Sequence, residues 1–362
     1  MSRSAAIAPP SARLAGLDLL RLPAAFALLL CHAGFWLAPF GWPDAFWWML
    51  GHLGVEVFLV CAAFLAARRA FAAPHFLPGR AIVRGVLRLW PLYALFLAAN
   101  LLLAPAAPVP AGTWLPYVVL GQNLAWPHPP FFGEAWIVAA AMLLAVVVPL
   151  LCAGLRRLGA AAGLAVLVAG IAVGWLVRAL VVAATDPDFD EGVRKILLLR
   201  LDLPFYGVLV AWLAARRPVL PAGWRGAMAL VGAGVLGGVV HAHLHGPMDA
   251  SFAARVAVPG LADLGWALLV AAASTLALPD RFARGLAVLA DAAYAGLLSH
   301  MTLLRVLLAA GAPLLVTSRA HGLGLLLAYL VAATLLAILV SRCLDRPWRR
   351  RLAQRLPPVA ER

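Results

Sequence analysis

The stretch LDLLRLPAAFALLLCHAGF, from Leu17 to Phe35, carries an arginine and a histidine inside an otherwise apolar run. Arg21 and His32 are eleven residues apart, a spacing that returns a helix to nearly the same face and leaves roughly 16 Å between them along its axis. Asp18 falls within about 40° of the same stripe. Ionisable groups at bilayer depth are costly unless they face a polar cavity, so the stripe indicates a functional site. The alternative is an arginine that snorkels to the interface and a core histidine bonded to a backbone carbonyl.

The composition places this helix in a membrane. Hydrophobic residues make up 64% of the 362 residues and charged residues 12%, and the mean hydropathy is +0.94. Soluble folds of this length do not bury so much apolar surface, and the runs are long enough to span, so the sequence predicts an all-α polytopic membrane protein with about ten transmembrane helices in a single domain over residues 1–362. The helices are expected near residues 14–38, 46–70, 82–105, 135–155, 160–184, 195–215, 225–243, 261–279, 288–311 and 321–343.

Arginine clusters between the apolar runs predict the orientation in the membrane. They follow the second, fourth, sixth, eighth and last runs, whereas the loops 39–45 and 106–134 contain no lysine or arginine. Because basic loops stay in the cytoplasm, both termini are expected there, and the Pro-rich segment 106–134 is expected to form an outer or re-entrant segment. A net charge of +14 distributed in this way fits membrane topology rather than a nucleic-acid surface, so no nucleic-acid partner is expected.

The third run carries two arginines, Arg84 and Arg88, four residues apart and therefore on one helix face near the cytoplasmic side. Pro91 follows, where it should kink the helix and free a carbonyl. Guanidinium groups offer planar, forked donors that suit phosphate or carboxylate, so the pair indicates an anion site. The alternative is a cytoplasmic anchor, which fits Arg84 better than the deeper Arg88.

Acidic and basic residues also lie in the second and sixth runs. Glu56 is about ten residues into the second helix, too deep for the interface, and must be protonated or paired with an arginine or with His32. Arg200 and Asp202 open the sixth helix near the outer surface. For these two residues, a local ion pair and a substrate contact are both open.

Histidines recur in the later helices. His300 lies in the middle of the ninth span, with Tyr294 one and a half turns earlier, and its simplest interpretation is a hydrogen bond to a neighbouring helix. The run HAHLH, His241 to His245, has no carboxylate or cysteine beside it to complete a ligand set. We therefore expect no metal site.

Several segments, taken in order, resemble one known family. LDLLRLPAAFALLLCHA looks like the first-helix signature of the acyltransferase 3 family of integral membrane O-acyltransferases, in which an arginine precedes a histidine by eleven positions. GVEVFLVCAAFL resembles that family's GVD-FF-x-x-SGF motif, and RGVLRLWPLY resembles its R-R-x-x-R-I-x-P-x-Y motif. RLDLPFYGVLVA resembles R-x-D-x-F-x-x-G, DAAYAGLLSHMTLL resembles S-Y-S-L-Y-L-W-H-x-P, and LDRPWRR resembles the closing E-x-P-x-R segment. The matching residues are Arg21, His32, Glu56, Arg84, Arg88, Pro91, Tyr93, Arg200, Asp202, Gly207, Tyr294 and His300.

The resemblance implies a multi-pass protein of the bacterial cytoplasmic membrane that transfers an acyl group, often acetyl. The donor would be cytoplasmic acyl-CoA, used as a substrate with no bound cofactor, and the acceptor a hydroxyl of a glycan or lipid-linked molecule, often on the periplasmic side. Membrane lipid is the other expected partner. The transfer needs a base that exchanges protons near neutral pH, which suits a histidine. We assign catalysis to His32, Glu56 and Arg21, donor binding to Arg84 and Arg88, and substrate contacts to Asp18, Trp136, Arg200, Asp202, Tyr294 and His300.

One departure from the family pattern bears on activity. The W-S-L-S-x-E motif stands here as WIVAAA, with Trp136 kept and Ala141 where the glutamate belongs. Glu134 lies two turns before Ala141 and would share its face if the helix extended that far. The loss of the glutamate motivates an alternative function, a relative without transferase activity that binds or transports a lipid-linked glycan or acyl species. A secondary transporter built from inverted repeats is a third hypothesis, weakened because no internal repeat is visible.

Overall fold

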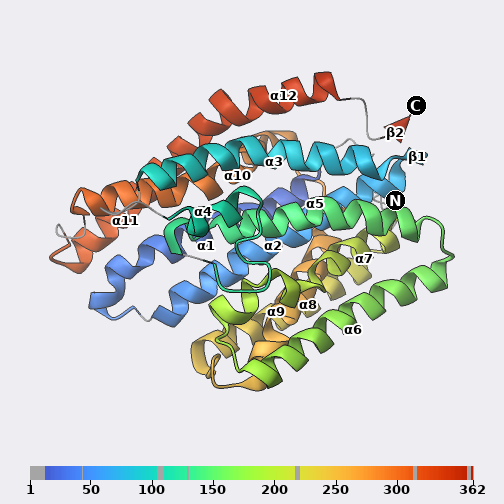
Figure 1. Ribbon diagram of the computed structural model, residues 1–362, viewed down its shortest axis with the longest axis horizontal. Helices are drawn as coiled ribbons and strands as arrows, with labels where there is room; N and C mark the ends of the chain where they lie inside the picture. Colours follow the sequence, from blue (N-terminus) through green and yellow to red (C-terminus); the bar gives the residue numbers. More distant parts are fainter. Residues whose placement is uncertain are drawn as a thin grey trace.

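A computed structural model describes residues 13–42, 44–103, 110–128, 130–216, 221–312, 316–356 and 360–361. Within these residues the chain forms a helical bundle in which ten helices are long and apolar enough to cross a membrane (Figure 1). This confirms the predicted all-α, polytopic membrane architecture. The side of the membrane on which the termini lie stays a prediction.

The spans follow the chain in order. They are α1 (Ala15–Ala33) continued by the turn η1 (Gly34–Phe40), α2 (Asp44–Ala72), α3 (Pro78–Leu102), α5 (Ala135–Leu155), α6 (Ala160–Thr185), η4 (Leu197–Arg200) leading into α7 (Leu203–Arg216), α8 (Ala222–His245), α9 (Phe252–Ala273), α10 (Asp280–Ala309), and α11 (Arg319–Val340) continued through η6 (Ser341–Asp345) into α12 (Arg346–Arg355). The shorter elements are β1 (His75–Phe76), α4 (Ala111–Val118), η2 (Pro130–Phe132), η3 (Asp190–Arg194) and β2 (Ala360–Glu361).

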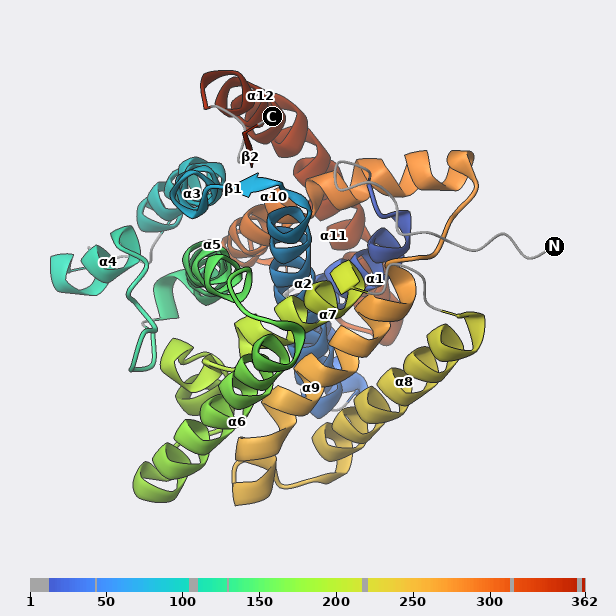
Figure 2. The ribbon, with the colours of Figure 1, turned by 90° about the vertical axis from the view of Figure 1, so that its right-hand side faces the viewer.

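Helix α2 lies at the centre of the bundle, with α1, α5, α7 and α9 around it (Figure 2). Glycines allow this close packing. A Cβ on Gly54 would lie 2.7 Å from the carbonyl oxygen of Ala24 in α1, and one on Gly207 in α7 would lie 2.6 Å from that of Val60. Helices α6 and α8 lie at the periphery, and most of their residues are exposed on the protein surface. Small residues thus bring the central helices together.

Two helix starts differ most from the prediction. The eighth span begins at Phe252 rather than near 261, because the Ser251 hydroxyl accepts a hydrogen bond from the Ala254 backbone N–H at 3.1 Å and Pro259 is tolerated inside the helix. The ninth begins at Asp280 rather than near 288, directly after Pro279. An apolar run marks the part of a helix that lies in hydrocarbon, whereas backbone hydrogen bonding continues through polar turns beyond it.

The segment 106–134 is folded against the bundle where it is described. Tyr117 of α4 and Phe132 of η2 are both buried, with their rings stacked at 6.3 Å. The Gln122 side chain donates a hydrogen bond from Nε2 to the Ala135 carbonyl at 3.1 Å, which ties the segment to the start of α5. Its predicted place as an outer or re-entrant segment stays a prediction, and residues 104–109 lie outside the described residues.

Candidate functional site

A cavity of about 820 Å³ lies between α1, α2, α3, α5 and α10, and the end of α11, η6 and α12 complete its wall. Charged side chains gather in the half of the cavity near the start of α1 and α10, and the wall between there and the middle of α10 is mostly apolar. Seven arginines and three aspartates line it: Arg13, Arg21, Arg68, Arg69, Arg84, Arg88, Arg349, Asp18, Asp291 and Asp345. The cavity is therefore cationic at one end.

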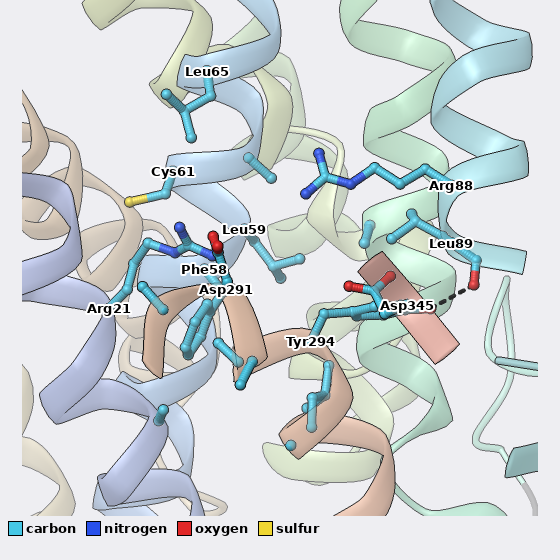
Figure 3. A pocket seen from close by; sticks show the side chains of 18 of the residues that line it. Arg21, Phe58, Leu59, Cys61, Leu65, Arg88, Leu89, Asp291, Tyr294 and Asp345 are labelled. Carbon is cyan, nitrogen blue, oxygen red and sulfur yellow. Dashed lines mark hydrogen bonds between the residues drawn. The ribbon is translucent and has the colours of Figure 1, made fainter. Parts of the chain in front are cut away.

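The charged half of the predicted stripe on α1 faces this cavity. Asp18 and Arg21 both line it, and Asp18 accepts a hydrogen bond from Arg13 Nε at 2.6 Å. The Arg21 guanidinium lies 3.5 Å from Asp18 and 5.7 Å from the ring centre of Phe58. Figure 3 shows Arg21 reaching into the cavity from α1, opposite Arg88 from α3. The free-energy cost of burying these charges is thus offset by ion pairing and by exposure to an open cavity.

His32 itself is not part of the cavity wall. It is half-buried, and its Nδ1 lies 3.0 Å from the Leu28 carbonyl oxygen and 3.1 Å from Nε2 of His300. His300 is fully buried, lines the cavity and has its own Nδ1 3.0 Å from the Gly296 carbonyl oxygen. His32 therefore reaches the cavity through His300, and the expected hydrogen bond from His300 to a neighbouring helix is present.

These contacts assign the tautomers of the two neutral imidazole rings. A carbonyl oxygen only accepts, so the Nδ1 that faces it carries the hydrogen in both His32 and His300. Nε2 of His300 is then unprotonated, and the single Nδ1–H of His32 is shared between it and the Leu28 carbonyl oxygen. Nε2 of His32 is left with its lone pair, which is the state that a general base requires.

The two predicted arginines on α3 differ in their surroundings. Both line the cavity, but Arg84 donates a hydrogen bond to the Leu356 carbonyl at 2.7 Å, near the end of α12. Arg88 projects into the cavity, and among the described residues it has no hydrogen-bond or ion-pair partner (Figure 3). The Tyr294 hydroxyl donates to the Leu89 carbonyl at 2.6 Å and so ties α10 to α3 beside Arg88. Arg88 is the arginine of the pair that is available to a ligand.

Glu56 belongs to a second polar cluster that does not line the cavity. Arg200 binds both of its carboxylate oxygens, at 2.9 Å and 2.7 Å, and also binds Asp263 of α9 at 2.9 Å. Nε2 of His52 lies 3.6 Å from Glu56, and Nδ1 of His52 lies 2.6 Å from Nε2 of His243. The predicted arginine partner of Glu56 is therefore Arg200. The cluster joins α2, α8 and α9 to η4, the turn that leads into α7.

Asp202 pairs with Arg178 of α6 rather than with Arg200, its neighbour in sequence. The Tyr206 hydroxyl lies 3.4 Å from Asp202 and accepts from the Trp175 indole N–H at 2.8 Å. Arg200 and Asp202 thus each bind a helix distant in sequence. As with Glu56, the cavity wall does not include them, and their predicted substrate contacts stay predictions.

The position of the replaced glutamate faces the cavity. Ala141 lines the wall, while Trp136 is buried beside it, with the Arg194 guanidinium 4.8 Å from its ring centre. Glu134 directly precedes α5, is 2% exposed and does not line the cavity. Glu134 therefore does not occupy the place that the carboxylate at position 141 would take.

The histidine run at the end of α8 holds no metal-ligand set within the described residues. The rings of His241 and His245 lie 4.8 Å apart, while His243 turns inward to His52. The alternation of the run thus reflects one buried face and one exposed face of a helix.

A family model described as an acyltransferase domain matches residues 14–342, nearly the whole chain. The chain belongs to the acyltransferase 3 family. Searches of curated proteins and of solved structures found no match. The protein is a multi-pass membrane acyltransferase, and an acyl donor, an acyl acceptor and membrane lipid follow as its partners.

The sequence pattern alone does not indicate that several charged residues belong to the acyltransferase cavity. Arg13, Arg69, Asp291 and Arg349 all line it. Arg13 and Arg69 lie at helix ends, where a charge is expected at the membrane interface and carries no further signal, while Asp291 lies within α10 and Arg349 within the short helix α12. Helical spacing within one element could not have identified them, because they come from four different elements.

Proposed function

We propose that this acyltransferase moves an acyl group, most simply acetyl, from cytoplasmic acyl-CoA to a hydroxyl of a glycan or a lipid-linked acceptor in the bacterial cytoplasmic membrane. The observation that carries the donor assignment is the cavity, where seven arginines face three aspartates among the described residues. Guanidinium groups bind phosphate through charge-assisted, forked hydrogen bonds. The donor's phosphates bind at the arginine end, and its thioester arm follows the apolar wall toward His300.

The histidine pair supports the chemistry. Nε2 of His32 takes the proton of the acceptor hydroxyl as the hydroxyl oxygen attacks the thioester carbonyl. The C–S bond breaks, CoA leaves as a thiolate, and the proton passes from the imidazolium to that sulfur. An ester and CoA are the products, so the protons balance. The Leu28 carbonyl oxygen and Nε2 of His300 share the Nδ1–H of His32 and keep the ring in the tautomer that acts as a base.

The donor and the acceptor approach His32 from opposite sides. His300 lines the cavity and contacts His32, which lies on the predicted outer half of α1. The donor therefore reaches the histidine pair through the cavity. The acceptor hydroxyl meets Nε2 of His32 from the other side.

The second candidate is an inactive relative that binds or transports a lipid-linked glycan or acyl species. The observation that favours it is Ala141, which places a methyl group on the cavity wall where the family motif has a carboxylate. The two functions share the cavity and differ in turnover.

An acyl-transfer assay separates the two functions. Purified protein in detergent is incubated with labelled acetyl-CoA and membrane extract, in parallel with His32→Ala and with His241→Ala, an exposed histidine of α8. Loss of the general base is expected to lower transfer by about 10²–10⁴-fold in His32→Ala and to leave His241→Ala unchanged. Equal transfer by wild type and His32→Ala contradicts the mechanism. CoA binding without transfer by the wild type favours the inactive relative.

A further inference from the structure

The C-terminal helix α12, which begins within the LDRPWRR segment, lies beyond residue 342, where the family match ends, and supplies part of the cavity wall. Arg349 and Leu352 of α12 line the cavity, as does Asp345 just before the helix. On the other face of α12, Arg350 and Arg351 are exposed and do not line it. The helix therefore presents one basic residue to the cavity and keeps others outside it.

Helix α12 is attached to α3 along its length. The Trp348 indole N–H donates to the Leu87 carbonyl at 2.7 Å, and Arg84 binds the Leu356 carbonyl at 2.7 Å. Beyond it, β2 pairs antiparallel with β1, which directly precedes α3. These contacts are all to the segment that carries Arg88, so Arg349 and Arg88 are held on one structural unit.

The charges at this end of the cavity are not balanced by protein. Arg88 lies within electrostatic range of Arg349, Arg69 and Arg21. Asp345 also lies in that range, and it binds Arg349 at 2.9 Å. Like charges held together in a cavity repel each other, and a bound anion removes that cost. The convergence of arginines from three helices and α12 is the arrangement of an anion site.

We propose that α12 completes the donor site, and that Arg349 binds a phosphate group of the acyl donor together with Arg88. Asp345 holds the Arg349 side chain in the wall, and the attachment of α12 to α3 sets the distance between the two guanidinium groups. The identity of the donor as a CoA thioester rests on the proposed function. The anion site rests on the arrangement of the arginines alone.

The test is calorimetric binding of coenzyme A to purified, full-length protein in detergent. Arg349→Gln and Arg88→Gln are each expected to weaken binding by about tenfold or more, because each removes a charge-assisted hydrogen bond to phosphate. Arg350→Gln, the neighbouring exposed arginine of α12, is the matched control and should bind as the wild type does. Arg349→Lys keeps the charge but loses the fork, and it should fall between the wild type and Arg349→Gln.

Fragments of coenzyme A show which phosphate group is responsible for the weaker binding of Arg349→Gln. Pantetheine, which has no phosphate, should show no difference between wild type and Arg349→Gln. A penalty with 4′-phosphopantetheine as large as that with coenzyme A would place the contact at the 4′-phosphate, which both molecules carry. A penalty confined to coenzyme A would place it at the remaining nucleotide phosphates. Both of these results support the phosphate site.

The outcomes distinguish this inference from the proposed function. If coenzyme A binds wild type and Arg349→Gln equally, the role of Arg349 is wrong and the proposed donor stands. If coenzyme A does not bind the wild type, the proposed donor is wrong, and inorganic pyrophosphate becomes the probe. If pyrophosphate then binds Arg349→Gln more weakly than wild type, the anion site is supported. If pyrophosphate does not bind the wild type, the anion site is overturned too.

Discussion

Glu134 is a buried carboxyl group, 2% exposed, and neither of its oxygens has a hydrogen-bond partner among the described residues. Burial raises the pKa of Glu134 to about 8, and its own backbone N–H and the Arg305 guanidinium offset only part of that effect. The carboxyl is therefore protonated in the folded protein at neutral pH. In the unfolded chain it ionises with the ordinary pKa of 4.5.

This difference predicts how stability depends on pH. Between 4.5 and about 8 the folded state holds a proton that the unfolded state has released, so raising the pH through this window favours unfolding. The free energy of unfolding falls by at most about 1.4 kcal/mol per pH unit. The fall ends above the pKa of Glu134 in the folded protein, where both states are ionised. Glu134→Gln removes the ionisable group, so its melting temperature should fall less than that of the wild type between pH 5 and 8.

Tryptophan-fluorescence melting in detergent measures this difference. Asp280→Asn, at an exposed position at the start of α10, is the control and should follow the wild type. Parallel pH profiles for Glu134→Gln and the wild type would mean that Glu134 is ionised in the folded protein.

At the scale of elements, the packing of α7 on α2 depends on Gly207. A Cβ at this position would lie 2.6 Å from the Val60 carbonyl oxygen and 2.7 Å from the Phe64 backbone nitrogen. Backbone atoms cannot move aside as a flexible side chain can. This contact explains physically why the motif shared with the family has a glycine here.

Gly207→Ala is therefore expected to lower the free energy of unfolding by about 1–3 kcal/mol, the usual cost of overpacking a filled interior. The matched control is Gly234→Ala in α8, where an added Cβ would meet nothing within 4 Å. It should be neutral or stabilising by about 0.5–1 kcal/mol, because alanine favours helix. Thermal or denaturant unfolding in detergent measures both, and equal stability of the two variants would contradict the close approach of α7 to α2.

At the scale of the whole molecule, the predicted orientation decides on which side of the membrane each end of the site lies. The cavity's arginines and α12 are expected at the cytoplasmic face, and the segment around Trp126, which is 50% exposed, at the outer face. In a background in which the exposed Cys343 is changed to serine, Trp126→Cys should react with an impermeant thiol reagent in intact cells. Arg350→Cys should react only after permeabilisation. The opposite labelling pattern would invert the orientation and move the donor site to the outer side.

The number and type of helices follow from the sequence alone, because each apolar run must satisfy its backbone hydrogen bonds within itself in hydrocarbon. The placement of Asp18 and Arg21 on one cavity-facing stripe follows from helical spacing, which is a local property of α1. The family assignment also rests on short segments read in order.

Only the tertiary structure decided which distant groups meet. His32 and His300 are 268 residues apart, and their contact depends on how α1 packs on α10. Arg200 and Asp202 are near neighbours in sequence, yet their partners lie on α2, α9 and α6. A buried charge takes whichever opposite charge the packing brings within reach, and packing between helices is set by side-chain shape across the whole bundle rather than by any one run of residues.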